Sequence, residues 1–315
     1  MTRAVRPAVE QSAPPVQRRP VGVHRTRITV LSVLIGLAVA ALWSPQLVDD
    51  DIGVNLVHGL LGRDAATTSL SGTITGLVFA FVIGLAGTFT ACNIAVFAAI
   101  APAVQDRGAL SGRLRRAIGP LGWLALGALV TAGLYGAIGA RLGSRLPQLS
   151  TATVGAQHFP VRLLQSLVVF GLIGLVMLYL GAAALGAVPD PLARPAARWA
   201  PTRQVFMGVL IGGFLIGRPW PLFHTMFAHA AATHDAAFGA VAFMLVAIGN
   251  MVLMALLLLL LAMSGLPRWL ARKPGRIVTM TAAAWLVGGT FTFVYWAIRL
   301  PAKLGYGWFP TMPWH

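Results

Sequence analysis

The feature that most restricts the fold of this chain is a series of long apolar segments. Each has at least about 20 residues, the length that an α-helix needs to cross the hydrocarbon core of a membrane. Of 315 residues, 57% are hydrophobic and 10% are charged, and the mean hydropathy is +0.78. Soluble domains carry about 25% charged residues, so the expected fold class is an all-α polytopic membrane protein. The seven predicted spans are Ile28–Val48, Ile74–Ala101, Leu121–Ala140, Leu163–Val188, Val205–Ala232, Ala237–Gly265 and Ile277–Ile298.

The net charge of +16 follows from the predicted topology. Seventeen Lys and Arg residues precede the first span or follow the even-numbered spans, which places them on one side of the membrane. Six lie in the segments on the opposite side. Cytoplasmic loops carry such an excess of positive charge, which predicts a multi-pass protein of the cell membrane with a cytoplasmic N-terminus and an external C-terminus. Since topology accounts for the basic residues, no nucleic-acid partner is predicted, and membrane lipid is the expected environment.

The spans divide the chain into five parts. Residues 1–27 are predicted to be a disordered cytoplasmic tail, and residues 28–72 an anchor helix with an external loop from Ser44 to Gly72. The anchor is preferred to a cleaved signal peptide, which is the alternative. Residues 73–188 and 189–301 then form two sets of three helices with opposite orientation, and residues 302–315 an external tail. This arrangement predicts two inverted repeats, each opening with a broken helix.

Two motifs 126 positions apart support the repeat. The segment Ala86–Ala99 contains the only cysteine, Cys92, and the segment Gly213–Phe223 echoes it. At this offset Gly87 pairs with Gly213 and Cys92 with Arg218. Pro219 and Pro221 predict a helix break, because each lacks a backbone donor and obstructs the preceding turn. In the first half, the residues Gly84, Gly87, Thr88 and Thr90 permit a break.

The first motif resembles the cytochrome c biogenesis transmembrane proteins (CcdA) and the membrane domain of the thiol:disulfide interchange reductase DsbD. Thr90-Ala-Cys92-Asn-Ile-Ala95 keeps the Thr and Cys of that family's Thr-Pro-Cys-x-x-Pro pattern and replaces both prolines by Ala. In the second half, Pro221 and Phe223 are kept, and Arg218 stands where the second cysteine belongs. The resemblance spans about Thr73 to Pro301.

This resemblance implies a role in extracytoplasmic thiol–disulfide exchange or in maturation of cytochrome c or another cofactor protein. Thioredoxin-like or cytochrome-maturation proteins would be its partners. The family's relay needs an attacking and a resolving thiol. With one cysteine in total, Cys92 could act only through mixed disulfides with partners. The alternative function is transport of a small anion, a thiol compound or a metal on the same scaffold.

The candidate site residues surround the two motifs. Cys92 is the candidate catalytic thiol, and a nearby Arg218 would favour its reactive thiolate. An arginine inside a membrane span usually lines a polar cavity or meets a partner. The structural alternative is that Cys92 is a small buried apolar residue and that Arg218 caps carbonyl groups freed by the prolines. Other predicted binding residues are Thr90, Asn93, Pro219 and Pro221, and Asn250 is a further polar residue at depth.

Histidines near the external end of the fifth span are weak metal candidates. His224, His229 and His234 are spaced by five residues, which turns successive side chains about 140° around an α-helix. They therefore do not share one face, and a role in a loop or interface is favoured over metal binding by His224 and His229. No cofactor is predicted. Phosphate-binding loops, Ser-His-Asp arrangements and paired carboxylates are absent from the sequence, which disfavours hydrolytic and phosphoryl-transfer chemistry.

Overall fold

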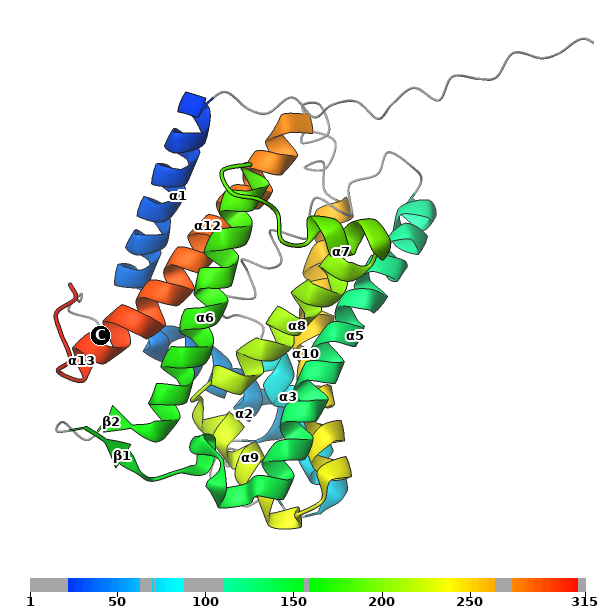
Figure 1. Ribbon diagram of the computed structural model, residues 1–315. Coiled ribbons are helices and arrows are strands. Elements are labelled where there is room, and N and C mark those ends of the chain that lie inside the picture. Colours follow the sequence, from blue (N-terminus) through cyan, green and yellow to red (C-terminus); the bar gives the residue numbers. More distant parts are fainter. Residues whose placement is uncertain are drawn as a thin grey trace, which may run out of the picture.

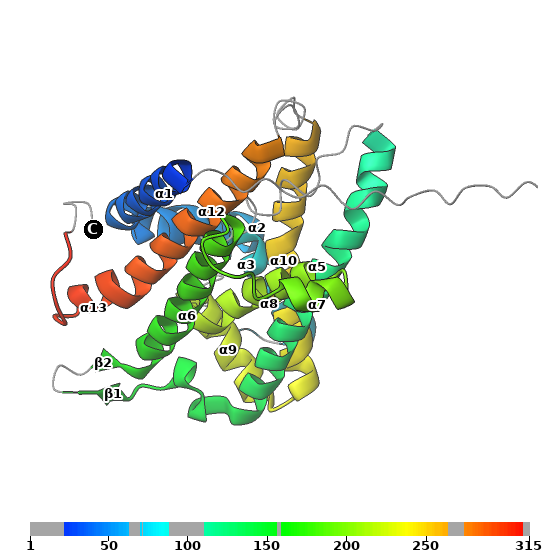
Figure 2. The same ribbon diagram turned by 45° about the horizontal axis from the view of Figure 1, so that its top comes forward.

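The computed structural model describes residues 22–62, 70, 72–87, 110–155, 159–263 and 274–310. Within these residues, five helices are long and apolar enough to cross a membrane, and a bent pair makes a sixth span if it is counted as one. The long helices run side by side in Figure 1, and the same arrangement is visible after rotation in Figure 2. The prediction of an all-α polytopic membrane protein is confirmed at this level.

The first part of the chain forms α1 (Gly22–Leu42), a π-helical segment η1 (Gln46–Val54) and α2 (Asn55–Leu61). The predicted external loop from Ser44 to Gly72 was therefore wrong over residues 46–61, which are helical. Apolar packing explains the difference, since Val57 is completely buried in the core. A Cβ atom at Gly53 would also lie only 2.9 Å from Cζ2 of Trp220, so η1 packs directly on the bundle. The first span ends at Leu42 rather than at Val48.

The remaining helices follow the predicted order of spans, joined by short helical turns and by a pair of antiparallel two-residue strands, β1 and β2. Of the second predicted span, the described part is α3, and the fifth span is the bent pair α8 and α9. The bounds are α3 (Thr73–Ala86), α5 (Leu110–Leu142), η4 (Gly143–Arg145), η5 (Pro147–Leu149), β1 (Thr153–Val154), β2 (Phe159–Pro160), α6 (Val161–Ala184), α7 (Ala193–Arg198), α8 (Thr202–Gly217), α9 (Pro221–Thr233), α10 (Ala236–Met263), α12 (Pro274–Val294), η6 (Tyr295–Arg299) and α13 (Leu300–Lys303).

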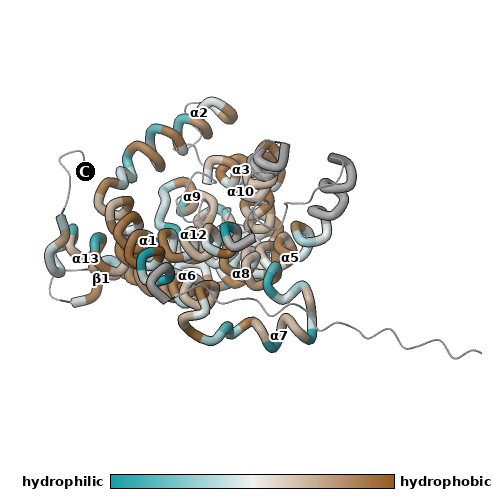
Figure 3. The backbone as a smooth tube through the Cα atoms, turned by 90° about the horizontal axis from the view of Figure 1, so that it is seen from above, coloured by the Kyte–Doolittle hydropathy of each residue, from teal (hydrophilic) through white to brown (hydrophobic). Residues whose placement is uncertain are grey.

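Hydrophobic and hydrophilic residues lie in different parts of the bundle. Figure 3 shows apolar residues predominating along α1 and hydrophilic residues on α7. The starts of α1, α5 and α12 lie at the same end as α7 in Figure 1, and the β1–β2 hairpin and α13 lie at the opposite end. Arg25 of α1 donates a hydrogen bond to the carbonyl oxygen of Gly186 at the first end. This bond joins the start of α1 to the connection that follows α6.

At the other end, α1 is joined to α12 by an arginine. Arg299 in η6 is 1% exposed, and its Nη1 donates to the carbonyl oxygen of Ala40 in α1. Close packing continues along the pair, because a Cβ atom at Gly36 would lie 2.6 Å from Cβ of Thr290. The anchor helix is thus fixed to the last span.

Two helix crossings match each other closely in the backbone contacts of their glycines. In the α3–α10 crossing, a Cβ atom at Gly84 would lie 2.2 Å from the carbonyl oxygen of Val246. In the α8–α5 crossing, a Cβ atom at Gly208 would lie 2.0 Å from the carbonyl oxygen of Leu124. Such distances leave no room for a side chain, so glycine is required in both crossings.

The reciprocal contacts match as well. A Cβ atom at Gly249 of α10 would lie 2.3 Å from the carbonyl oxygen of Phe81 and 2.9 Å from the nitrogen of Leu85. A Cβ atom at Gly127 of α5 would lie 2.2 Å from the carbonyl oxygen of Val205 and 3.0 Å from the nitrogen of Val209. These contacts relate Phe81 to Val205 and Leu85 to Val209, an offset of 124. The sequence motifs, by contrast, pair Gly87 with Gly213 at an offset of 126.

Candidate functional site

The candidate site is built on the break between α8 and α9. The two helices meet at an angle of 88°, with Arg218, Pro219 and Trp220 between them. Pro219 and Pro221 have no N–H group for the preceding turn, which ends α8 at Gly217 and starts α9 at Pro221. The predicted break at the two prolines is confirmed. It leaves backbone carbonyl groups of α8 without the donors that a continuous helix would provide.

Side chains from three other elements donate to these carbonyl groups. The oxygen of Ile216 accepts hydrogen bonds from Nε2 of Gln165 at 2.7 Å and from the hydroxyl of Tyr135 at 3.2 Å. Nε2 of Gln165 also lies 2.8 Å from the Tyr135 hydroxyl. The oxygen of Arg218 accepts from Nε2 of Gln148 at 3.0 Å. In the structural alternative, Arg218 provides this capping; here Gln148, Gln165 and Tyr135 do so.

The guanidinium of Arg218 reaches the end of α3 instead. Its Nη1 donates to the carbonyl oxygen of Gly87, the C-cap of α3, at 3.1 Å. A cation at a helix C-terminus interacts favourably with the partial negative charge of the unpaired carbonyl groups. The guanidinium carbon also lies 4.5 Å from the ring centre of Trp220 and 5.3 Å from that of Phe223. The charge is therefore held by a helix end and two aromatic faces.

Asn250 of α10 belongs to the same cluster. Its side chain is 3% exposed, and its Oδ1 would lie 3.9 Å from a Cβ atom at Gly87. Asn250 was singled out in the sequence as a polar group at depth, and the structure brings it beside the Arg218 contact. All eight acidic residues of the sequence lie outside the interiors of the predicted spans. The spans therefore bring no carboxylate from their interiors to the Arg218 guanidinium.

The break also buries polar atoms that have no hydrogen-bond partner in the described part of the chain. They are Nε1 of Trp220 and the Oε1 atoms of Gln148 and Gln165. Trp220 and Gln148 are each 3% exposed. A buried polar group without a hydrogen bond costs about 1–3 kcal/mol, which favours a polar solute or water as its partner. The break therefore holds one buried donor and two buried acceptors without a partner in the described part of the chain.

Only part of the predicted site can be located. Cys92, Asn93 and Thr90 lie outside the described residues, as does the expected break in the first half. Arg218, Pro219 and Pro221 lie together at the break. The structure adds Gln148, Gln165, Tyr135 and Trp220, which sequence reasoning missed. The one signal for Gln165 was an amide side chain within an otherwise apolar span, and no local pattern pointed to Gln148.

The histidines do not assemble with one another. His224 is exposed on α9, His229 is half-buried against Phe238, and His234 is exposed in a left-handed conformation with φ of 52°. Among the described residues, no group of three or more His, Cys, Asp or Glu side chains could hold a metal ion. Asp235 instead accepts a hydrogen bond from the nitrogen of Ala237 at the start of α10.

Comparison with known proteins adds no relative: no family model, no curated protein and no solved structure matches the chain. The class of protein that the fold defines is a multi-pass helical membrane protein, with a broken span that carries a half-buried arginine.

Proposed function

We propose that the chain is an inverted-repeat membrane transporter for a small anionic solute, with Arg218 as the binding group. The two matched helix crossings support the repeat, because α3 packs on α10 through the same backbone positions as α8 on α5. The repeats would then be α3, α5 and α6 in one half and α8–α9, α10 and α12 in the other. In inverted-repeat transporters, substrate sites lie near the membrane midplane at broken helices.

The observation that carries the function is the position of Arg218. Its guanidinium lies at the 88° break, where it joins the end of α3 to the second half of the protein. Guanidinium groups bind carboxylates and oxyanions through two parallel N–H groups. The buried donor of Trp220 and the acceptors of Gln148 and Gln165 suit a solute that has both acceptor and donor atoms, such as a protonated oxyanion or an amino acid.

The experiment uses the full chain in proteoliposomes. Electrogenic currents or solute uptake would be measured after concentration jumps of sulfate, phosphate, sulfite, acetate and cysteine. At least one of these solutes, each of which carries an anionic group, should be transported. Arg218→Lys should then reduce its apparent affinity at least about tenfold, because Lys lacks the planar fork and a hydrogen bond to a charged group contributes about 1.5–3 kcal/mol.

Arg145→Lys is the matched control, since Arg145 is exposed in η4 and the same substitution is made there. The control should transport like the parent protein. Transport that is unchanged in Arg218→Lys would reject Arg218 as the binding group, and absence of transport for all five solutes would reject this function.

A second candidate function is the thiol–disulfide role implied by the resemblance to CcdA and DsbD. One observation favours it: Arg218 contacts Gly87, and Cys92 is only five residues further along the chain. A guanidinium close to a thiol would increase its thiolate fraction and its reactivity. Cys92 would then form a mixed disulfide with a thioredoxin-like partner, whose second cysteine resolves it.

Trapping in cells separates the two functions. Under the redox hypothesis, a partner should be captured on the parent chain as a disulfide that reductant releases. Cys92→Ser removes the only thiol, so the adduct and partner reduction should disappear, and Arg218→Lys should retain part of both. In a transporter that uses Arg218, Cys92→Ser should leave transport near the parent level.

A further inference from the structure

A second candidate site lies between α5 and α10. The two helices touch at one end, where a Cβ atom at Gly136 would lie 2.2 Å from the carbonyl oxygen of Gly239. Towards the start of α5 and the end of α10 they separate around a cavity of about 390 Å³. This size falls within the range of about 300–1,000 Å³ that small-molecule sites occupy.

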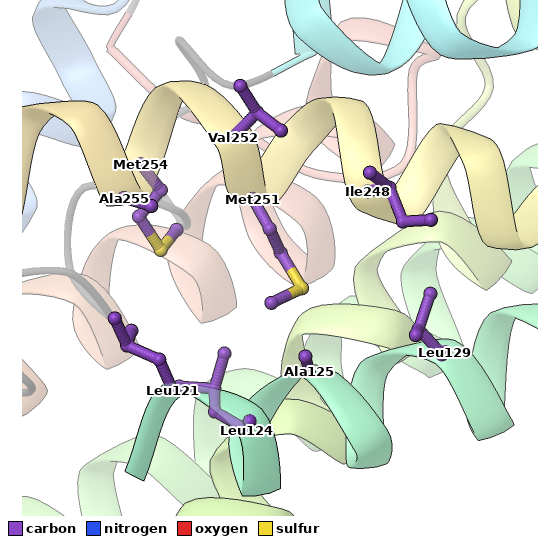
Figure 4. Close-up of a pocket in the computed structure, with 10 residues that line it drawn as sticks. Leu121, Leu124, Ala125, Leu129, Ile248, Met251, Val252, Met254 and Ala255 are labelled. Atoms are coloured by element: carbon purple, nitrogen blue, oxygen red, sulfur yellow. The ribbon is translucent and has the colours of Figure 1, made fainter. Parts of the chain in front are cut away.

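The cavity is lined by apolar side chains and one glycine. Figure 4 shows Met251 and Met254 extending from α10 towards α5, where Leu121, Leu124 and Ala125 lie opposite them. Methionine side chains are flexible and polarizable, and they fit ligands of irregular shape. A lining of this kind offers no hydrogen bonds and excludes a polar solute such as the proposed transport substrate.

The neighbouring helix faces identify the surroundings of the cavity. Leu126 and Val130 of α5 are 45% and 47% exposed, and Val252 and Leu256 of α10 are 47% and 49% exposed. In a membrane-spanning bundle these exposed apolar side chains face the hydrocarbon chains of the bilayer. The cavity is therefore continuous with lipid rather than with water.

The depth of the cavity follows from a tryptophan pair. Trp123 of α5 and Trp199, directly after α7, pack edge to face at 5.3 Å, and both are more than one-third exposed. Tryptophan is enriched at the level of the lipid headgroups. The cavity thus begins near the headgroup level, at Leu121, and extends towards the bilayer centre, at Leu129.

Positive charge gathers at that same level. Arg198 immediately precedes Trp199, and both Arg198 and Arg194 are exposed on α7. Arg203, near the start of α8, is paired with Asp190. In the sequence, three further arginines occupy the first two turns of α5: Arg113, Arg115 and Arg116. Arg116 precedes Leu121 by five residues, a rise of about 7.5 Å along the helix axis. Basic residues next to a span attract anionic lipid headgroups.

We propose that this cavity binds one acyl chain of an anionic phospholipid, whose headgroup lies beside the exposed arginines of α7, Arg194 and Arg198. The apolar lining, the continuity with the hydrocarbon region and the adjacent positive charge all select this class of ligand. The bound chain fills the space between α5 and α10 at the end where the two backbones are not in contact, and so stabilises their separation there.

The test uses phosphatidylglycerol with a photoactivatable diazirine in one acyl chain, added to the purified full chain in mixed micelles. After irradiation, cross-linked peptides are mapped by mass spectrometry. Cross-links should concentrate at Leu121–Leu129 and Ile248–Ala255. Unlabelled phosphatidylglycerol should compete at least about tenfold better than phosphatidylcholine with the same chains, which corresponds to about 1.4 kcal/mol.

Ala125→Trp should fill the cavity and lower cross-linking at these peptides at least fivefold. Leu134→Trp is the matched control, because Leu134 lies on the same helix and is 60% exposed. It should leave the pattern unchanged. Elution of both variants as monodisperse protein in size-exclusion chromatography would show that they fold.

Three outcomes would overturn the proposal. Cross-links spread evenly over the exposed apolar faces, and insensitive to Ala125→Trp, would indicate surrounding bulk lipid only. Labelling of other faces without labelling of the cavity peptides would mean that another part of the protein fills the space. Equal competition by the two phospholipids would reject the selection of an anionic headgroup.

Discussion

Nη1 of Arg218 donates a hydrogen bond of 3.1 Å to the carbonyl oxygen of Gly87, across 131 positions of sequence. One residue lies at the break of the α8–α9 span, and the other caps the C-terminus of α3. This bond connects the proposed first repeat to the break in the second. The buried amide groups of Gln148 and Gln165 hold the other side of the break through backbone carbonyl oxygens.

The matched glycine crossings predict matched effects of substitution. Gly84→Ala and Gly208→Ala would each place a Cβ atom within 2.2 Å of a backbone carbonyl oxygen, so the crossing helices must separate. Overpacking of this kind costs about 1–3 kcal/mol. Both variants should lower the apparent unfolding temperature in detergent by several degrees. Gly122→Ala on α5 is the control, since a Cβ atom there meets nothing within 4 Å, and it should unfold like the parent.

If Gly84→Ala and Gly208→Ala unfold like Gly122→Ala, the helices do not cross as described, and the evidence for the repeat fails with them.

The polar support of the break predicts coupling between two side chains. Tyr135 and Gln165 both donate to the carbonyl oxygen of Ile216 and also contact each other. Tyr135→Phe keeps the ring contacts with Phe227 and Phe243 and removes one donor, which should cost about 0.5–1.5 kcal/mol. Gln165→Leu should cost more, about 1–3 kcal/mol, because it removes the shorter bond to the carbonyl oxygen.

A double-mutant cycle on the unfolding free energy measures this coupling. The two losses should differ from additivity by at least about 0.5 kcal/mol. Strict additivity would mean that the two side chains act separately, and no network would then hold the break.

The break was the most predictable part of the site, because its cause is local. Pro219 and Pro221 lack the backbone N–H groups that a continuous helix needs, so the end of α8 and the start of α9 follow from the sequence itself. The support of the break was not predictable, since Gln148 and Gln165 reach it from η5 and α6 through the tertiary fold. The motif comparison pairs residues at an offset of 126, whereas the matched glycine contacts of α3 and α8 relate residues at an offset of 124.

Segment length was a weaker guide outside the spans. The residues that form η1 and α2 lack a long apolar run, and they were predicted to be loop. Their burial depends on single contacts, such as Val57 in the core and Gly53 against Trp220, which have no periodic signature. The relation of Cys92 to Arg218 stays a prediction, because Cys92 lies outside the described residues.

The distribution of charge predicts the orientation of the bundle. Reporter fusions after Arg203 should be active only as cytoplasmic reporters, and fusions after Pro301 only as external ones, because arginine-rich loops stay in the cytoplasm. A fusion after Arg116 should match that after Arg203. An external signal after Arg203, or a cytoplasmic C-terminus, would contradict both the topology and the opposite orientation of the two halves.

The central claim is that the Arg218 break forms a polar site that small solutes reach from water at membrane depth. It is tested most directly by labelling Arg218→Cys in a Cys92→Ser background, where the introduced thiol is the only one. A small, charged, membrane-impermeant methanethiosulfonate should modify this cysteine. Leu134→Cys in the same background, on the exposed apolar face of α5, should stay unmodified. Reaction of the Arg218→Cys thiol only with lipid-soluble reagents, or with none, would contradict the claim.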